Sequence, residues 1–584
     1  MNLLLTLGHN SSAIWTDGTT VIGYEQERIS RIKSDSRFPV DAINEIFKTV
    51  PADTKTLDVF VSHWFDCKSL NRAKDPRLKK YWDFTKLKSM AKKHGFKDVD
   101  LHETTGHEDS HTHHDAHAWS AVEFYRQHLT EMPSGEVHIL VCDGFGNHQE
   151  VFSVYSINPK TNFWAPYKIA KSSGYTRSLG LMYQYATSFC GMKENQDEYK
   201  FLGYESHIHE VLTKDQIRVL RDRAQSYVGM LFVSKGTLLF AELENEEFGD
   251  FIDIDLLLAA KENFNRIFQS LLNDLGVVNT DGKVDPKRVI IGHFVQCVIE
   301  NYYSAIIDKF GIKNVIVTGG VHYNVKLNHH ILSNVEGQFC AVPLAGDQGA
   351  AIGVYAKNKL RFPFANLRWG KRSLSPNMAG DSEPLESSEY IWTDSRDAYI
   401  NVITELIKQD RLVNTITGWM EFGPRALCNT STLAQATVEN VRMINELNGR
   451  DTVMPFAPVI SDKKAKYYFE SSQKRVVGSL KYMVTTLDYT RHIPSYVMGV
   501  AHPYPGGHTH SGRPQIVGPE DTSPIADILE GLEGGPIINT SLNVHGVPIV
   551  FSLKDAIADM RYNVKVADSS NGTVKKPVLV VGNF

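Results

Sequence analysis

The sequence has few cysteines, no strong excess of one charge and no long apolar run. Its six cysteines are scattered over 584 residues without a Cys-x-x-Cys pair, which argues against a disulfide framework or a zinc ribbon and indicates reduced thiols. A net charge of −5 does not indicate a nucleic-acid-binding protein. No apolar run reaches membrane-span length, and the N-terminus lacks the basic start of a signal peptide. We therefore expect a soluble cytoplasmic protein with no membrane partner.

The length of the chain predicts more than one domain. With 584 residues, of which 42% are apolar, the chain is too long for a single hydrophobic core. Residues 366–390 are rich in Pro, Ser, Gly and Asn, which is typical of a linker. We predict one α/β domain over residues 1–365 and a second over residues 391–584.

Two segments of the first predicted domain share one pattern. Residues 1–24 and 137–157 both read as strand, polar turn and strand. This repetition predicts a duplicated sheet that holds a nucleotide between two lobes. A further strand enters a turn at Gly319 and Gly320, and Asn324 follows it. Backbone amides at such a turn can contact a nucleotide closely.

Four histidines lie within the seven residues from His111 to His117. On a helix His113 and His117 would share one face, where two imidazoles can bind one metal ion. Surface histidines are the alternative, and an isolated His-x-x-x-His pattern favours them. Asp143 at a strand end and Asp347 before a helix of small residues could complete a metal site. An ordinary Asp-Gly turn and a helix N-cap are the alternatives for these two aspartates.

One segment of this acidic chain is basic. Between residues 71 and 97, ten lysines and arginines face only two aspartates, and Tyr81, Trp82 and Phe84 are interleaved with them. Such a segment can bind a polyanion. A solvated helical arm is the other interpretation of the same pattern.

Twelve short motifs resemble, in their order, those of the ATP-dependent O-carbamoyltransferases of nodulation-factor, cephamycin and tobramycin biosynthesis. They are GHNSSA, EQERISRIK, HHDAHAWSA, CDGFG, SLGLMY, EYKFLG, VTGGVHYN, AGDQGAAIG, EFGPRAL, PFAP, RPQIV and NTSLN. The resemblance covers nearly the whole chain. It implies an α/β protein with a duplicated actin-like (ASKHA) N-terminal domain, as in the tRNA threonylcarbamoyl transferases, followed by a YrdC-like α/β domain.

The resemblance also implies a reaction. The YrdC-like domain would make carbamoyl adenylate from carbamoyl phosphate and ATP, with Mg²⁺ accompanying the ATP. The actin-like domain would transfer the carbamoyl group to an acceptor hydroxyl, with Fe²⁺ or another divalent metal polarising the reacting oxygens. By matching position, the metal ligands would be His113, His117, Asp143 and Asp347.

The other site residues follow from matching positions in the motifs. His9 would be the general base, Asn10 replaces the aspartate usual in the family, and Lys33 would neutralise the adenylate phosphate. Contacts to nucleotide or substrate would come from Ser12, Arg28, Glu198, Lys200, Gly319, Gly320 and Asn324. Carbamoyl phosphate and ATP would be bound by Arg425, Arg513, Asn539, Thr540, Ser541 and Asn543. The chain departs from the family pattern at Cys428, Thr430, Met454 and His510, where the family usually has Gly, Arg, Arg and Asp.

No motif identifies the acceptor. The basic segment leads us to predict a hydroxymethylated pyrimidine in a nucleotide or in DNA, bound through residues 71–97. Family precedent offers sugars and antibiotic hydroxyls as the alternative. Because Thr430 replaces a phosphate-binding arginine, a non-catalytic nucleotide-binding protein with a decayed second domain is a further hypothesis. We also allow for a homodimer.

Overall fold

The computed structural model describes residues 1–50, 55–63, 81–104, 112–160, 164–234, 237–238, 254–276, 284–358, 360–364, 366–374, 390–450, 456–490, 492–504 and 509–584. Four predictions concern residues outside these ranges. They are His111, residues 71–80 of the basic segment, most of the predicted linker, and Met454.

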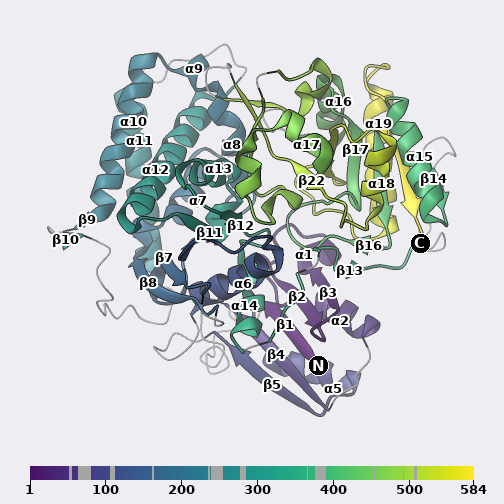
Figure 1. The fold of residues 1–584 in the computed structure, drawn as a ribbon, viewed down its shortest axis with the longest axis horizontal. Helices are drawn as coiled ribbons and strands as arrows, with labels where there is room; N and C mark the ends of the chain where they lie inside the picture. Colours follow the sequence, from purple (N-terminus) through teal and green to yellow (C-terminus); the bar gives the residue numbers. More distant parts are fainter. Residues whose placement is uncertain are drawn as a thin grey trace. The chain divides into compact units, whose positions relative to one another are not determined.

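The chain divides into two compact units (Figure 1). Unit 1 consists of Met1–Val21, Ser34–Ala365 and Arg475–Ser479. Unit 2 consists of Ile22–Lys33, Asn366–Lys474 and Leu480–Phe584. A short piece of each unit therefore comes from the part of the sequence that mainly forms the other.

Two five-stranded sheets with the same strand order lie in unit 1, except that residues 22–25 of one edge strand are assigned to unit 2 (Figure 1). The first has the order β3-β2-β1-β4-β5, with strands Val21–Glu25, Ser12–Thr16, Asn2–Thr6, Thr56–Ser62 and Asp98–Glu103. The second has the order β8-β7-β6-β11-β12, with strands Tyr167–Ser173, Glu150–Ile157, Val137–Cys142, Asn314–Thr318 and Phe339–Ala341.

Pairing directions are also repeated between the two sheets. β1 is antiparallel to β2 and parallel to β4. β6 is likewise antiparallel to β7 and parallel to β11. The central strands β1 and β6 are short apolar runs with almost every residue buried, as expected for strands covered on both faces. The duplicated sheet that the sequence predicted is therefore confirmed.

Helices pack around these sheets, and two long ones were expected from their periodicity. The apolar periodicity of residues 255–275 and 288–310 predicts two long amphipathic helices, and the structure has them as α11 (Ile254–Leu275) and α12 (Pro286–Phe310). α12 starts with an Asp285 cap and ends at Gly311, whose φ is 59°. The other helices of the unit are α2 Val40–Thr49, α5 Phe84–His94, α6 His113–His128, α7 Leu179–Phe189, α8 Phe201–Tyr204, α9 Ile208–Val211, α10 Lys214–Phe232, α13 Val325–Asn334 and α14 Ala350–Lys357.

α6 and α14 lie directly against each other in unit 1. A Cβ atom at Gly353 of α14 would lie 1.7 Å from the carbonyl oxygen of Ala116 on α6. Only glycine permits so close an approach, because any side chain there would collide with backbone. This contact fixes the start of α14 beside the start of α6, where the candidate metal ligands lie.

Unit 2 is built on a seven-stranded mixed sheet of order β14-β24-β15-β17-β23-β18-β22. Two buried clusters cover this sheet: one includes side chains of α15 (Arg396–Lys408) and α18 (Pro524–Gly531), the other those of α19 (Leu553–Ser569). The strands, in sheet order, are Tyr390–Thr393, Val578–Gly582, Val413–Thr417, Thr430–Gln435, Ile537–Ser541, Ala457–Ser461 and Gln515–Val517. The unit also contains α1 Gln26–Ser30, α16 Val438–Asn448, α17 Asp462–Tyr468 and the strands β19 Leu487–Asp488, β20 His502–Pro503 and β21 His510–Gly512. The α/β class predicted for the chain is confirmed.

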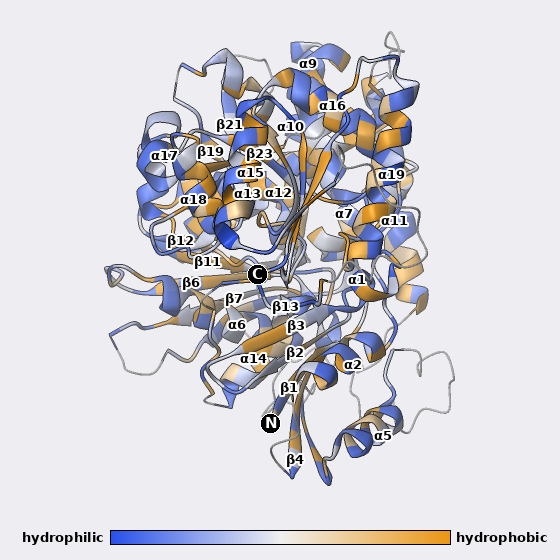
Figure 2. Ribbon diagram, turned by 90° about the vertical axis from the view of Figure 1, so that its right-hand side faces the viewer, coloured by the Kyte–Doolittle hydropathy of each residue, from blue (hydrophilic) through white to orange (hydrophobic). Residues whose placement is uncertain are grey.

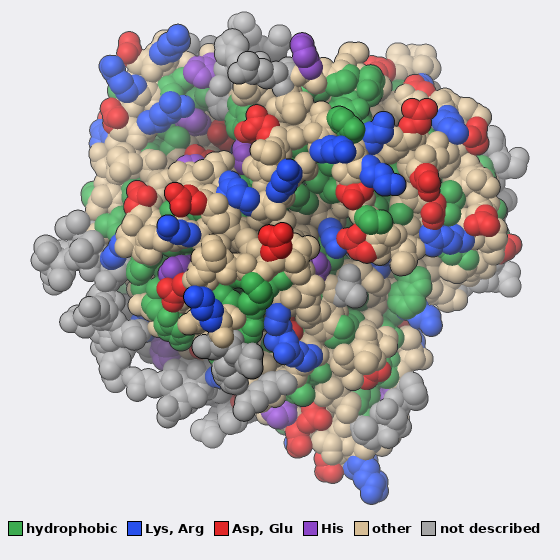
Figure 3. All heavy atoms as spheres, in the orientation of Figure 1, with side chains coloured by type: hydrophobic (Ala, Val, Ile, Leu, Met, Phe, Trp, Pro, Cys, Tyr) green, Lys and Arg blue, Asp and Glu red, His purple; other side chains and the backbone are tan. Residues whose placement is uncertain are grey.

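Hydropathy and charge follow the usual pattern of a folded α/β protein. In Figure 2 the central strands are largely hydrophobic, whereas the helices carry both hydrophobic and hydrophilic residues. On the face seen in Figure 3, Lys and Arg side chains are interspersed with Asp and Glu. None of the helices in the described ranges combines the length and the apolar character needed to span a lipid bilayer.

The exchanged segments are held by specific hydrogen bonds within each unit. In unit 1, Arg475 donates to the carbonyl of Leu332 at 3.0 Å, and the hydroxyl of Ser479 accepts from the amide of Ala341 at 2.8 Å. In unit 2, Arg28 donates to the carbonyl of Gly423 at 2.6 Å. The EQERISRIK motif, with Arg28 and Lys33, therefore packs with the C-terminal half of the chain.

Candidate functional site

The start of α6 is fixed by a capping box. The hydroxyl of Thr112 accepts from the amide of Asp115 at 3.2 Å, and the Asp115 carboxylate accepts from the amide of Thr112 at 3.0 Å. The helix therefore begins at His113, and His113 and His117 project from one face of it, as predicted. Both imidazoles are only 1% exposed, so they are not surface histidines.

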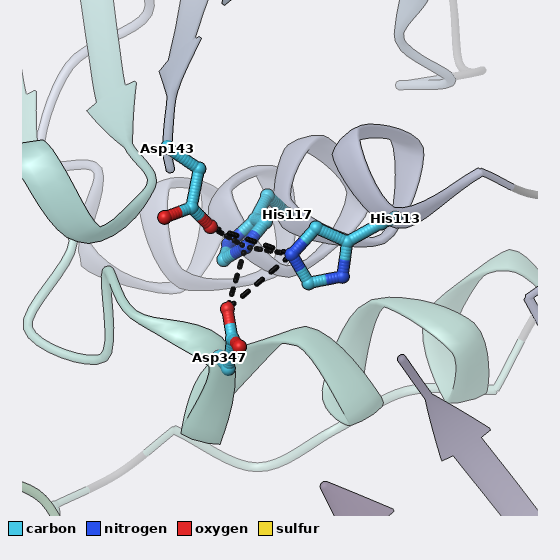
Figure 4. Close-up of side chains that lie close together, drawn as sticks. All are labelled: His113, His117, Asp143 and Asp347. Carbon is cyan, nitrogen blue, oxygen red and sulfur yellow. Dashed lines mark hydrogen bonds and ion pairs between the residues drawn. The ribbon is translucent and has the colours of Figure 1, made fainter. Parts of the chain in front are cut away.

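Asp143 and Asp347 approach these imidazoles from two other elements (Figure 4). Asp143 directly follows β6, and Asp347 opens a single 3₁₀ turn that leads into α14. The four side chains point toward one another, and one ligand atom from each lies within 4.8 Å of the others. The structure thus brings together all four residues that the resemblance named as metal ligands.

The distances within this His/Asp cluster suit a small divalent ion. Nε2 of His113 is 3.3 Å from Oδ2 of Asp143 and 3.3 Å from Oδ1 of Asp347. Nε2 of His117 is 3.2 Å and 3.5 Å from the same two oxygens, and 3.2 Å from Nε2 of His113. Ligands about 2.0–2.1 Å from a tetrahedral ion are separated by roughly 3.3–3.4 Å. The cluster could therefore hold a small divalent ion.

In the His/Asp cluster, the positive charge of the protonated histidines balances the negative charge of the aspartates. Burial alone lowers the pKa of His113, but Asp347 and Asp143 outweigh it and raise this pKa to about 10. Burial also opposes the charged form of His117, yet its hydrogen bonds to both carboxylates raise its pKa. Despite burial, the imidazoles hold the pKa of each aspartate below its ordinary value. A bound cation would replace protons on the imidazoles, because a metal ligand must be deprotonated.

The predicted glycine turn supports Asp143. A Cβ atom at Gly320 would lie 3.0 Å from Oδ1 of Asp143, and one at Gly319, where φ is +93°, would lie 2.1 Å from the carbonyl oxygen of Cys142. The amide of Gly144 donates to Oδ1 of Asp143 at 2.8 Å. Gly319 and Gly320, which we expected near a nucleotide, therefore pack against the strand end that carries this carboxylate.

His114 faces away from the cluster into a second buried network. Its Nδ1 is 2.8 Å from the hydroxyl of Ser153, which donates to Glu150 at 2.6 Å. Lys168 donates to the same Glu150 oxygen at 2.6 Å and lies 3.3 Å from Asp115 of the capping box. Burial lowers the pKa of His114 to about 4, so this imidazole is neutral. The network supports the first turn of α6, and sequence reasoning missed it because its members come from three elements, α6, β7 and β8.

The predicted general base lies at the edge of the His/Asp cluster. Nδ1 of His9 is 4.0 Å from Oδ2 of Asp347, and the His9 side chain is 46% exposed. Asn10 follows it and is partly buried, and Ser12 is buried where β2 begins. Asp347 can thus orient His9, although Asn10 replaces the aspartate that the family usually has.

The remaining residues predicted in the first part of the chain do not join this cluster. Asn324 caps α13, accepting from the amide of Leu327 at 2.9 Å and donating to Gln296 at 2.7 Å. Lys200 pairs with a neighbouring aspartate at 3.0 Å, and burial raises the pKa of Glu198. In unit 2, Lys33 pairs with Glu27 at 3.0 Å and Arg28 with Glu25 at 2.8 Å.

A cluster of three arginines forms the main charged feature of the predicted donor region in unit 2. Burial lowers the pKa of Arg513, and the positive charges of Arg425 and Arg450 lower it further. Arg450 donates to the hydroxyl of Thr540 at 2.5 Å and lies 4.7 Å above the ring of Phe456. Three guanidinium groups placed together repel one another, which is the expected arrangement for binding a multiply charged anion. Our sequence reasoning named Arg425 and Arg513 but missed Arg450, which lies six residues before Phe456 of the PFAP motif.

The loop that carries Arg425 is organised by Glu421. One oxygen of this fully buried carboxylate accepts from the amides of Leu427, Asn429 and Thr430 at 2.7, 2.8 and 3.1 Å. Cys428 in the same loop has a φ of 74°, in the left-handed region that favours glycine. By the resemblance, this is the position where the family usually has Gly, so Cys428 adopts a backbone conformation that glycine would take more readily.

Thr430, which replaces a family arginine, contacts another arginine. Its hydroxyl accepts from Arg372 at 2.8 Å. The same guanidinium donates to the carbonyls of Thr417 at 2.6 Å and Phe551 at 3.1 Å, and burial lowers its pKa to about 10. Position 430 is therefore part of the packing around Arg372, and the side chains that cluster as an anion site are those of the three arginines.

The NTSLN motif divides between two environments. Asn539 donates through Nδ2 to the carbonyl of Ala426 at 2.8 Å, and Thr540 contacts Arg450. Ser541 ends β23 and is partly buried. Asn543 instead donates to the carbonyl of Val547 at 2.8 Å and stabilises the turn that follows. Asn539 thus contacts the loop that carries Arg425, and Thr540 contacts Arg450.

The contact between α6 and α14 gives a direct test of how the His/Asp cluster is positioned. Replacing Gly353 with alanine should push α14 away from Ala116 and lower the free energy of unfolding by about 3 kcal/mol. Asp347 should move away from His113, so metal retention should fall as well. Thermal unfolding and metal content after dialysis measure both effects. Gly229→Ala is the control, because nothing lies within 4 Å of its Cβ; equal behaviour of the two variants would contradict the prediction.

Comparisons with known proteins found several that are similar to this chain. An uncharacterized protein of Synechocystis, sll1178, is 24% identical over 94% of this chain and 91% of its own length. Nodulation protein NolNO of Sinorhizobium fredii is 28% identical over 42% of this chain and 37% of its own length. Among solved structures, Thermococcus kodakarensis HypF aligns with 61% of this chain and 48% of its own, with a TM-score of 0.27.

Two family descriptions match most of the chain. Residues 4–356 match the description "Carbamoyltransferase N-terminus", and residues 404–567 match "Carbamoyltransferase C-terminus". The first match alone covers more than half of the 584 residues. The two matches occur in the order of the two halves described above, and this chain belongs to the carbamoyltransferase family of enzymes.

Proposed function

We propose that this protein is an O-carbamoyltransferase that makes carbamoyl adenylate with its C-terminal domain and uses it in its N-terminal domain. The observation that carries the proposal is the buried cluster of His113, His117, Asp143 and Asp347 with His9 at its edge. We assign the transfer step to residues 1–365 and adenylate formation to residues 391–584, joined by residues 366–390.

In the first half-reaction, carbamoyl phosphate, ATP and one water give carbamoyl adenylate, phosphate and pyrophosphate. Water first breaks the bond between the carbamoyl and phosphate groups of carbamoyl phosphate, which gives carbamate and phosphate. A carbamate oxygen then bonds to the α-phosphorus of ATP, and the bond from that phosphorus to pyrophosphate breaks. Arg425, Arg450 and Arg513 would hold the phosphate groups, with Mg²⁺ on the triphosphate. Thr540 positions Arg450, and the repulsion that lowers the pKa of Arg513 would be relieved by the bound anion.

In the second half-reaction, the acceptor hydroxyl oxygen bonds to the carbamoyl carbon, and the bond from that carbon to the AMP phosphate oxygen breaks. AMP leaves with the electron pair. His9 would take the proton from the acceptor hydroxyl, since its Nδ1 faces Asp347 and its ring is half exposed. Lys33 would balance charge on the adenylate phosphate, and Gly319, Gly320 and Asn324 would lie near the adenosine.

The donor set suits a borderline divalent ion. Two imidazole nitrogens and two carboxylates are ligands that Fe²⁺ accepts, and the set does not exclude other first-row ions. When bound, such an ion acts as a Lewis acid on the carbonyl and phosphate oxygens. His113 and His117 would supply neutral nitrogens, and Asp143 and Asp347 would balance the charge of the ion.

The proposed activity is tested by product analysis. Purified protein loaded with Fe²⁺ is given ATP, carbamoyl phosphate and, in turn, hydroxymethylpyrimidine nucleotides, DNA containing them, and sugars. We expect pyrophosphate release that requires carbamoyl phosphate, and mass spectrometry should find a carbamoyl group on one acceptor. Absence of both pyrophosphate and carbamoylated product with every acceptor would refute the proposal. Retained pyrophosphate release would also exclude a decayed, non-catalytic second domain.

For the acceptor we propose a hydroxymethylated pyrimidine in DNA, held through the phosphate backbone by the basic segment. Within its described part, Lys86, Lys88, Lys92 and Lys93 are exposed on α5. Trp82 is instead buried and stacks on Phe84 with ring centroids 5.7 Å apart. The aromatic rings therefore anchor the helix to unit 1, which favours contacts to phosphates over stacking with bases.

Reversing the charge of lysines on α5 tests whether DNA binds to this segment. Replacing Lys92 and Lys93 with glutamate should weaken DNA binding about tenfold or more at 0.1 M salt and reduce the salt dependence of binding. Fluorescence anisotropy with a labelled duplex, at several salt concentrations, measures both quantities. In the matched control, glutamate replaces Lys463 and Lys464, which are exposed on α17. An unchanged affinity and salt slope for the α5 variant would remove DNA from consideration.

A further inference from the structure

The side chain of Asn539 is buried in unit 2 with one end hydrogen-bonded and the other end not. Its Nδ2 donates to the carbonyl of Ala426 at 2.8 Å and to Oε1 of Gln515 at 2.9 Å. Because both partners are acceptors, they fix which end of the amide is nitrogen. The residue is 3% exposed, and its Oδ1 has no hydrogen-bond donor among the residues that the structure describes. A buried amide oxygen without a donor is costly, so such atoms call for an explanation.

The residues that hold this amide lie next to arginines of the proposed donor site in sequence or in space. Ala426 directly follows Arg425, and Thr540, which directly follows Asn539, contacts Arg450. Oε1 of Gln515 also lies 3.5 Å from the thiol of Cys428, so the Gln515 carboxamide is held from two sides. The Asn539 amide therefore has a fixed orientation close to the loop and the strand that carry the anion-binding arginines.

An amide oxygen cannot serve the phosphate part of a ligand. Phosphate oxygens are acceptors and would repel Oδ1, whereas the guanidinium groups attract them. The oxygen suits a part of the same ligand that carries hydrogen-bond donors. In a carbamoyl donor, that part is the amino group on the carbonyl carbon.

We propose that Oδ1 of Asn539 accepts a hydrogen bond from the amino group of the carbamoyl donor and makes this site selective for carbamoyl over acetyl groups. The inference rests on the proposed function, for which it names the residue that discriminates between donors. A carbamoyl group and an acetyl group have nearly the same shape, but only the former has N–H bonds. With an acetyl donor bound, Oδ1 would stay buried without a partner, which is the situation in which sites reject an analogue strongly.

The test compares two donors in each variant. Pyrophosphate release from ATP is measured with carbamoyl phosphate and with acetyl phosphate, and the ratio of their kcat/KM values is taken. We expect the wild-type protein to favour carbamoyl phosphate by roughly 100-fold or more. Asn539→Leu should lower kcat/KM for carbamoyl phosphate by about 100-fold while changing that for acetyl phosphate much less, so that the ratio approaches one.

A second variant separates recognition from folding. Asn539→Asp keeps an oxygen acceptor toward the ligand and loses the donor toward Gln515, so both rates should fall but the preference for carbamoyl phosphate should persist. Because each ratio is measured within one preparation, a partly unfolded sample does not alter it. A purely structural amide would lower both rates equally in both variants.

Each outcome bears on the inference. An unchanged ratio in Asn539→Leu, or a wild-type protein that does not distinguish the two donors, would overturn the role of Asn539 and leave the proposed function intact. A wild-type protein that releases pyrophosphate with neither donor would overturn the proposed function, and this inference with it. A ratio that collapses in Asn539→Leu and persists in Asn539→Asp would support it.

Discussion

Replacing His117 with alanine should abolish carbamoyl transfer while leaving adenylate formation unchanged. The substitution removes one of two nitrogen ligands and leaves Asp143 and Asp347 facing a single imidazole. Loss of a ligand should weaken metal binding by more than 100-fold, since removal of groups that only orient ligands already costs 10- to 100-fold. We expect transfer to fall by at least about 1,000-fold, measured as carbamoylated product per unit time.

The same preparation supplies the internal check. Pyrophosphate release dependent on carbamoyl phosphate should stay within about twofold of the wild-type rate, because the arginine cluster lies in unit 2. His209→Ala, at an exposed histidine of α9, is the matched control and should retain both activities and the metal. If His117→Ala keeps its metal content and its transfer rate, the His/Asp cluster is not the metal site.

Replacing Arg513 with methionine should have the opposite pattern, with adenylate formation lost and transfer retained. Arg513 is partly buried beside the charges of Arg425 and Arg450, which lower its pKa. Removing a preorganised donor from a developing phosphate charge costs about 10²–10³ in rate. The variant supplied with preformed carbamoyl adenylate should therefore still carbamoylate the acceptor at the wild-type rate.

Arg513→Met should also stabilise the free protein. Without a bound anion, the three guanidinium groups repel one another, and an apolar side chain of similar length removes that repulsion. We expect the free energy of unfolding to rise by about 1 kcal/mol, the usual trade-off at a functional site. Pyrophosphate should raise the melting temperature of the wild-type protein and do so much less in the variant.

The control for Arg513→Met is Arg442→Met, at an exposed arginine that pairs with Glu439 on α16. The melting temperature and the activity of this control variant should stay close to those of the wild-type protein. A variant at Arg513 that is less stable than the wild type and still forms adenylate would show that this arginine has a structural role only.

The local features of the site followed from the sequence because they depend on residues close together in the chain. The capping residues Thr112 and Asp115 and the four-residue spacing of His113 and His117 determine a helix with both imidazoles on one face. The repeated strand–turn–strand pattern determined the duplicated sheet, since apolar runs bounded by polar turns form strands wherever they occur. Periodicity determined α11 and α12 for the same local reason.

Tertiary structure decided which distant residues meet. Asp143 and Asp347 reach His113 only because β6, the turn before α14 and α6 pack together, with Gly353 permitting the contact to Ala116. Family motifs named these residues, but chain spacing alone could not place carboxylates 30 and 234 positions away from His113 within 3.3 Å of it.

Dependence on contacts between distant segments also explains why Arg450 and the burial of Trp82 were not predicted. Arg450 joins Arg425 and Arg513 through sheet pairing and loop packing, so no local pattern marks it. The sequence showed aromatic residues among lysines, but only the fold showed that Trp82 is buried and the lysines of α5 are exposed. Local backbone preferences and periodicity depend on neighbouring residues, so the sequence alone determines them. Burial and the convergence of charged side chains depend on contacts between distant segments, which form only when the chain folds.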